Sequence, residues 1–167
     1  MDDDKRTTAF GLWRYGNEYL IAAFAVRKKP RDLLDEMRSK SVSMPAYFLV
    51  GHSIELTLKA FLRSRGVSLK LLRSRTFGHD LEALLKESRK RKLGNEIKLT
   101  KSEIESIALL NRTYKSKEFE YIVTGGVTLP TYGVISRIAE KLSKGLKEIS
   151  YKKTFNKSLQ PTRKPRG

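Results

Sequence analysis

The segment from Ser43 to Gly66 constrains the fold most strongly, because apolar residues recur along it on two sides of a single helix. Ser43 is a typical N-cap, Pro45 falls in the first turn, where its missing N–H costs no hydrogen bond, and Gly66 suits the position just after a helix. One stripe consists of Val50, Ile54, Leu58 and Phe61, and the other of Ala46, Leu49, Leu56 and Ala60. A helix with two apolar sides needs neighbours on both. We therefore predict that this helix lies at the centre of a helical bundle.

Four other segments, at about residues 8–27, 79–93, 100–114 and 130–149, also show apolar residues at helical spacing. The third of them opens with Thr100-Lys101-Ser102-Glu103, which matches a capping box. The connecting residues are expected to form a short amphipathic turn at 31–38, an Arg- and Ser-rich loop at 66–78 and an irregular segment at 115–129. No segment alternates convincingly as a strand does. The predicted fold class is therefore all-α, an antiparallel four- to five-helix bundle.

Positive charge is concentrated in two parts of this basic chain. The 167 residues include 35 Lys and Arg but only 18 Asp and Glu, which gives a formal net charge of +17. Residues 63–76 and 151–167 hold several bases and no acid. Such stretches attract phosphate backbones, although they also serve as a plain solubilising surface. We predict one helical-bundle domain over residues 1–150 and a basic, disordered tail over residues 151–167.

Composition excludes several classes of protein and site. The chain contains no cysteine, which excludes a disulfide scaffold, a cysteine-based zinc site and a thiol nucleophile. Two histidines without cysteine make a poor ligand set, so we predict neither a metal site nor a cofactor. The longest apolar run, residues 20–26, is too short to cross a membrane, and the polar, acidic start of the chain does not resemble a secretory signal. We expect a soluble, cytoplasmic protein with no membrane partner.

A polar stripe interrupts the apolar surface of the predicted central helix. His52, Glu55, Lys59 and Arg63 follow one another at steps of three, four and four residues, which places them on one side. Glu55 and Lys59 are spaced to form an ion pair. The stripe is either a solvent-exposed side with a local ion pair or the lining of a polar groove, because a charge buried in a bundle must be paired.

His79 is the second histidine, and it stands at the predicted start of a helix. Free N–H groups and the helix dipole favour an anion at such a position, and Arg73 and Arg75 lie just upstream. A phosphate held by both arginines and the helix start is one interpretation. The other is that His79 and Asp80 only cap the helix.

The run from Tyr47 to Leu62, together with Phe77-Gly78-His79-Asp80-Leu81, resembles the HEPN superfamily. It is most similar to small uncharacterised HEPN-like proteins with the pattern H-x-x-E-L-x-L-K followed by G-H-D-L. The resemblance is sharp over residues 46–85 and follows the helix order over about 8–149. It implies a four- to five-helix up-and-down bundle that often dimerises. Many members are RNases of toxin–antitoxin or other conflict systems, and others have lost catalysis and bind nucleotides or RNA.

The nuclease members carry a short motif. It consists of an Arg, usually with a polar residue directly after it, then four to six further residues and a His. Arg73 and His79 fit this spacing loosely, but Ser74 stands where the family prefers Asn, Asp or His. We therefore expect a non-catalytic module that binds RNA, a nucleotide or a partner protein, such as a cognate antitoxin. Its candidate site residues are His52, Glu55, Lys59, Arg73, Arg75 and His79.

The alternative is a metal-independent endoribonuclease with His79 as the acid/base and Arg73 or Arg75 stabilising the phosphorane. A purely structural role through dimerisation of the bundle is a third possibility, and a homodimer is expected in any case.

The last ten residues, from Ser158 to Gly167, resemble the tails of proteins read into the recombination site of integron gene cassettes. This resemblance implies a bacterial gene on a mobile element. It also implies that recombination of DNA, and not selection for binding, set the sequence of the tail.

Overall fold

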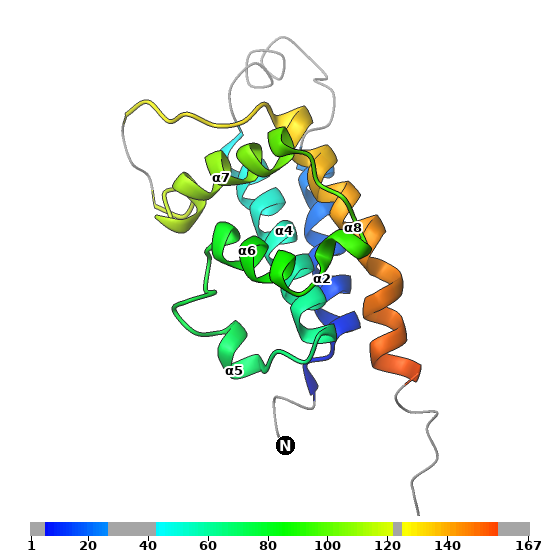
Figure 1. Cartoon of the computed structure of the whole chain (residues 1–167). Coiled ribbons are helices and arrows are strands. Elements are labelled where there is room, and N and C mark those ends of the chain that lie inside the picture. Colours follow the sequence, from blue (N-terminus) through cyan, green and yellow to red (C-terminus); the bar gives the residue numbers. More distant parts are fainter. Residues whose placement is uncertain (1–5, 27–42, 122–124, 157–167) are drawn as a thin grey trace, which may run out of the picture.

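The computed structural model describes residues 6–26, 43–121 and 125–156, and every regular element in these ranges is a helix. The predicted all-α class is confirmed for this part of the chain (Figure 1). The elements in chain order are α2 (Ala9–Val26), α4 (Met44–Ser64), α5 (Leu69–Leu72), α6 (Leu81–Lys90), the 3₁₀ turn η1 (Leu93–Asn95), α7 (Lys101–Lys115) and α8 (Tyr132–Phe155).

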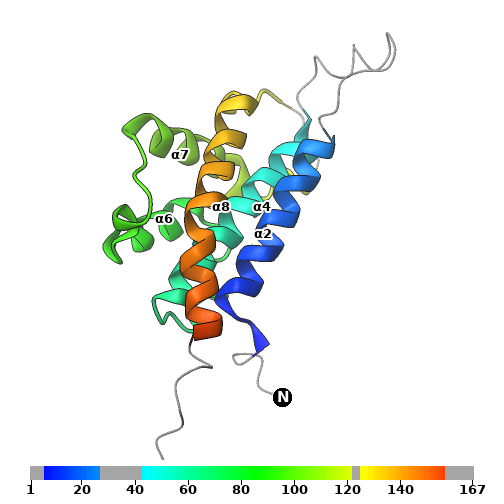
Figure 2. The same ribbon diagram turned by 90° about the vertical axis from the view of Figure 1, so that its right-hand side faces the viewer.

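Three long helices, α2, α4 and α8, lie side by side, and α2 runs opposite to the other two (Figure 2). The shorter helices α6 and α7 pack on the side of α4 that faces away from α2. Helix α4 therefore contacts α2, α6, α7 and α8. This arrangement confirms that the helix with two apolar sides is the centre of the bundle.

The ends and the interior of α4 follow from its sequence. The Ser43 side chain accepts a hydrogen bond from the N–H of Ala46 at 3.4 Å, and Gly66 leaves the helix with a φ of 87°. That φ is in the left-handed region, which favours glycine. Ile54, Leu58 and Phe61 are completely buried. Local capping thus sets the length of α4, and burial of its apolar stripes sets its position.

A close approach of backbones brings α2 against α4. A Cβ atom at Gly16 would lie 2.9 Å from Thr57 Oγ1 and 3.1 Å from the carbonyl oxygen of Ser53. Only a glycine on α2 therefore allows this separation.

The other element boundaries agree in part with the sequence-based expectations. The capping box at Thr100 is present. Helix α6 begins at Leu81, not at His79, and α5 was not predicted within the 66–78 loop. Helix α8 continues through Phe155, past the domain boundary placed at residue 150. The turn expected at residues 31–38 and the tail from residue 157 onward lie outside the described residues.

The extension of α8 is packed against the start of α2. The Phe10 N–H donates to Thr154 Oγ1 at 3.0 Å, and the Phe10 ring meets those of Tyr151 and Phe155 with centroids 5.4 and 5.5 Å apart. Residues 151–155 are therefore part of the bundle.

A membrane span was not expected, and none of the helices in the described part of the chain combines the length and apolar character that crossing a bilayer requires.

Replacement of a core isoleucine should destabilise the protein strongly. Ile54→Ala removes a fully buried side chain and should lower the free energy of unfolding by about 2–5 kcal/mol. Ile21→Ala is the matched control, because Ile21 lies on α2 with 59% of its surface exposed, and it should change stability by about 0.5 kcal/mol or less. Urea denaturation measures both, and equal effects would contradict the central position of α4.

Candidate functional site

A buried carboxylate, Glu55, is surrounded by polar side chains from three parts of the chain. Only 2% of its surface is exposed. Oε1 accepts from Lys59 Nζ at 2.5 Å, and Oε2 accepts from the Tyr114 hydroxyl at 2.5 Å and from His79 Nδ1 at 3.1 Å. His52 Nδ1 lies 3.5 Å from Oε2 and 3.0 Å from the Tyr114 oxygen. We call His52, Glu55, Lys59, His79 and Tyr114 the Glu55 cluster.

Helices α4 and α7 supply four of the five members of the cluster. Helical spacing places His52, Glu55 and Lys59 on successive turns of α4. Helix α7 supplies Tyr114, whose ring passes so close to Gly51 that a Cβ there would lie 2.6 Å from it. A side chain at position 51 would therefore displace the tyrosine.

His79 reaches the cluster from the turn that precedes α6. Its φ of 57° is in the left-handed region, which few residues other than glycine adopt. Such a conformation persists only where surrounding contacts enforce it. Here Phe77, two residues before His79, is buried, and the His79 ring is hydrogen-bonded to Glu55. The turn thus aims the imidazole at the carboxylate.

The side chains of the Glu55 cluster differ in how much of their surface is exposed to solvent. The side chains are 3% exposed at Glu55, 12% at Lys59, 20% at His52 and 38% at His79. The carboxylate therefore forms the floor, and the two imidazoles form the rim that meets the solvent.

The hydrogen bonds of His52 and His79 determine which ring nitrogen of each carries the proton. An ionised carboxylate only accepts, so His79 Nδ1 must donate to Glu55. The single Tyr114 hydroxyl proton goes to Glu55, so the tyrosine oxygen accepts from His52 Nδ1. In the neutral form, each histidine then carries its lone pair on Nε2. Neither Nε2 atom is among the fully buried, unpartnered polar atoms of the described residues.

The pKa values of the floor support this assignment. Burial raises the pKa of Glu55, but contact with His52, the Lys59 charge and hydrogen bonds from Lys59 and Tyr114 outweigh burial, so this pKa lies well below its usual 4.5. Burial and the adjacent carboxylate raise the pKa of Tyr114 far above its usual value of 10. Glu55 is therefore ionised and Tyr114 protonated at neutral pH.

Aromatic rings fix the orientation of His52. Its ring is nearly perpendicular to that of Tyr19, with centroids 4.4 Å apart, and it stacks on Phe48 at 5.8 Å with 8° between the planes. His52 is therefore positioned by packing as well as by its hydrogen bond.

The start of α6 differs from the anion site considered from the sequence. Asp80 caps the helix by accepting from the N–H of Ala83 at 3.0 Å, and Asn111 Oδ1 accepts from the N–H of Leu81 at 2.8 Å. Lys115 pairs with Asp80 at 2.5 Å. These N–H groups are therefore occupied, and an acid already stands where the anion was expected. Capping is the role of Asp80, whereas His79 belongs to the Glu55 cluster.

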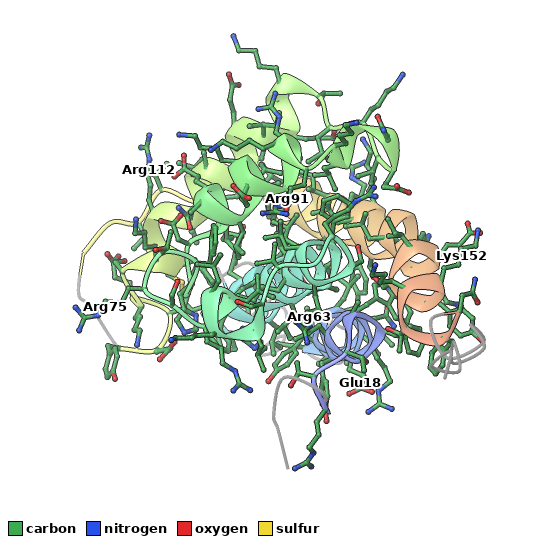
Figure 3. The ribbon with its side chains drawn as sticks, turned by 60° about the horizontal axis from the view of Figure 1, so that its bottom comes forward. Glu18, Arg63, Arg75, Arg91, Arg112 and Lys152 are labelled. Atoms are coloured by element: carbon green, nitrogen blue, oxygen red, sulfur yellow. The ribbon has the colours of Figure 1, made fainter. Side chains whose placement is uncertain are left out.

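The structure brings four of the six candidate residues together and places the two arginines elsewhere. His52, Glu55, Lys59 and His79 meet in the cluster. Arg73 ends α5 and is exposed, and the exposed Arg75 extends outward at the periphery of the molecule (Figure 3). Arg63, the last member of the α4 stripe, points away and donates to the carbonyl oxygens of Thr7 and Val67.

Tyr114 is the cluster residue that sequence reasoning did not identify as part of the site. Its spacing on α7 predicts a core position, and 3% exposure confirms that it is buried. It is 59 residues from Glu55 in the chain, and no local pattern reports that contact. The one signal in the sequence is that Tyr114 lies on the buried side of its helix, because a buried tyrosine hydroxyl requires a hydrogen-bond partner.

Comparison with known proteins identifies no relative of this chain. Models of protein families, curated proteins and solved structures were all compared, and none matches. Interpretation of the site therefore depends on its own geometry and on the residue patterns described above.

Removal of the buried charge should reduce both stability and its dependence on pH. Glu55→Gln leaves Lys59 without its counter-ion and should cost on the order of 3 kcal/mol at pH 7. The folded pKa of Glu55 lies below the unfolded one, so its stabilisation is complete above about pH 4.5 and is lost as the pH falls through the folded value. The slope of stability against pH below 4.5 should therefore be smaller in Glu55→Gln than in the wild type.

The control for this measurement is Glu105→Gln, which changes an exposed glutamate on α7 whose pair with Lys101 is 3.8 Å long. Urea titrations between pH 2.5 and 7 should show little change in that variant. An unchanged pH slope in Glu55→Gln would contradict the burial of an ionised carboxylate.

Proposed function

We propose that this protein is a HEPN-like module that binds RNA or a nucleotide, with the Glu55 cluster at the centre of its ligand site. The observation that carries the proposal is the pairing of two imidazoles over one buried carboxylate. Both rings are held through Nδ1, and neither Nε2 is among the buried, unpartnered polar atoms of the described residues. In the neutral form, the two Nε2 atoms are acceptors that suit the N–H groups of a nucleobase edge, and in the protonated form each Nε2 can donate to a phosphate.

Charge supports an anionic ligand. Glu55 is compensated by Lys59 within the cluster, so the floor presents no unbalanced negative charge. The chain carries a net charge of +17, and Arg73 and Arg75 stand a few residues before His79 in the same connection. A polyanion such as RNA would be attracted to this surface, with affinity that falls as salt rises.

The second candidate is an endoribonuclease, and the tautomers of the rim favour it. With Nδ1 protonated, Nε2 of one histidine can remove the proton of a ribose 2′-hydroxyl while the other, in its protonated form, supplies a proton. The 2′-oxygen would bond to phosphorus, the bond from phosphorus to the 5′-oxygen would break, and that oxygen would take the proton. The products are a 2′,3′-cyclic phosphate and a free 5′-hydroxyl, and no metal takes part.

Further parts of the proposal depend on the sequence alone. These are the HEPN-like arrangement of four to five helices, a homodimer, a cytoplasmic location, a protein partner such as a cognate antitoxin, and an origin in a bacterial integron cassette. The resemblance over residues 46–85 supports the helix arrangement, the homodimer and the protein partner. The short apolar run and the polar start of the chain support the cytoplasmic location, and the last ten residues support the cassette.

Paired substitutions test whether RNA binds near the cluster. Arg73→Ala with Arg75→Ala should weaken binding of a labelled single-stranded RNA and reduce the slope of log affinity against log salt by about 1.4. His79→Gln should weaken binding further, because it removes one rim imidazole while Glu55 keeps Lys59 and Tyr114. Fluorescence anisotropy over a range of salt concentrations measures both effects.

The matched control is Arg163→Ala with Lys164→Ala, which removes the same charge from the tail. It should reduce affinity less than the arginine pair in the connection that precedes His79. Equal losses from both pairs, together with no effect of His79→Gln, would show attraction by net charge only and would contradict a site at the cluster.

A cleavage assay decides between the two candidate functions. The endoribonuclease predicts 2′,3′-cyclic phosphate ends on the RNA products in the presence of a chelator, and about a hundredfold or greater loss of cleavage in His79→Ala and His52→Ala. The binding module predicts no cleavage by the wild type. Activity that survives in both variants would indicate a contaminating nuclease.

A further inference from the structure

We propose that His52, Glu55 and His79 also form a binding site for a divalent transition-metal ion, with Zn²⁺ as the best match. One ligand atom from each residue lies within 4.8 Å of those of the other two. The two Nδ1 atoms lie 3.1 and 3.5 Å from the same carboxylate oxygen, Glu55 Oε2. These residues come from α4 and from the turn before α6, so the fold and not local sequence assembles the set.

Two of the three ligand separations are close to those of tetrahedral coordination. Zinc binds histidine nitrogen and carboxylate oxygen at about 2.0–2.2 Å, which separates neighbouring ligand atoms by about 3.3–3.6 Å. The two measured separations from Oε2, 3.1 and 3.5 Å, are close to that range. The third separation, between the two histidine ligand atoms, lies within 4.8 Å, so a bound ion requires the two imidazoles to stand about 3.3–3.6 Å apart.

The remaining members of the cluster suit an outer shell. A carboxylate oxygen has two acceptor positions, so Oε2 can bind an ion and still accept from the Tyr114 hydroxyl. Lys59 occupies Oε1 and keeps the carboxylate oriented. Hydrogen bonds of this kind to metal-bound carboxylates are typical of protein metal sites.

The donor atoms select the class of ion. Two imidazole nitrogens and one carboxylate oxygen suit Zn²⁺ and its first-row neighbours, whereas Mg²⁺ and Ca²⁺ prefer oxygen ligands alone. Three protein ligands leave at least one position of a tetrahedral ion for water or another small ligand, as in catalytic and not structural zinc sites.

Metal binding through Nδ1 requires the imidazole tautomer with its proton on Nε2. Each neutral histidine can reach that tautomer by exchanging one proton with solvent, with no net release. The acid–base role of the endoribonuclease requires the proton on Nδ1 instead. One histidine therefore cannot bind the ion and act as the acid or base at the same time. The metal site does not depend on the proposed RNA binding and can be measured without RNA.

The experiment uses the full chain without an affinity tag, stripped of metal and titrated with Co²⁺ and Zn²⁺. We expect one ion per chain, visible absorption bands of tetrahedral Co²⁺ that Zn²⁺ abolishes, and no competition from Mg²⁺. Because the chain has only two histidines, NMR of the wild type should show the imidazole resonances of both shifting together on addition of Zn²⁺. This measurement needs no variant and so does not depend on whether variants fold.

Variants then identify the ligands. His52→Ala, His79→Ala and Glu55→Gln should each weaken Zn²⁺ binding about tenfold or more, with folding checked by circular dichroism. Glu103→Gln is the control, because Glu103 pairs with Lys141 and caps α7 outside the cluster. The proposal is overturned by no saturable binding, by one ion shared between two chains, or by histidine resonances that do not move together. A wild type that binds Zn²⁺ but no RNA would contradict the proposed function and leave the metal site standing.

Discussion

The buried charge of Glu55 is the constraint on which the rest of the structure depends. An ionised carboxylate without partners costs several kcal/mol inside a protein, so a sequence that places Glu55 in the middle of α4 must bring donors to it. Lys59 is supplied by the same helix, but Tyr114 and His79 come from α7 and from the turn before α6. The requirement for partners thus fixes how two later segments pack on α4, beyond what apolar contact alone specifies.

Features encoded by neighbouring residues were predictable from the sequence. The N-cap at Ser43, the left-handed Gly66 and the capping box at Thr100 are each local. The central position of α4 followed from its two apolar stripes, because each buried side needs a neighbour. The polar stripe left two interpretations open, and 2% exposure of Glu55 excludes a side that is purely solvent-directed.

Features that depend on distant contacts were not predictable in the same way. Periodicity indicates that Tyr114 faces inward but not that it meets Glu55, which is 59 residues away. At the start of α6, Asp80 accepts from the N–H of Ala83 and Asn111 accepts from the N–H of Leu81. The Asn111 contact exists only because α7 packs beside α6. The extension of α8 to Phe155 has the same origin, because Phe10 at the other end of the chain supplies the ring contacts.

Floor and rim of the cluster have different physical roles. The floor, Glu55 with Lys59 and Tyr114, is set by the cost of burial, and a change there disturbs folding before it disturbs any ligand. The rim histidines are more exposed, at 20% and 38%, and their contacts leave one nitrogen each for other use. A neutral imidazole has a single basic nitrogen. With the proton on Nδ1, the basic nitrogen is Nε2, which is left for an organic ligand. With the proton on Nε2, the basic nitrogen is Nδ1, which faces Glu55 and can bind an ion. The choice between the two uses is therefore made by one proton on each ring.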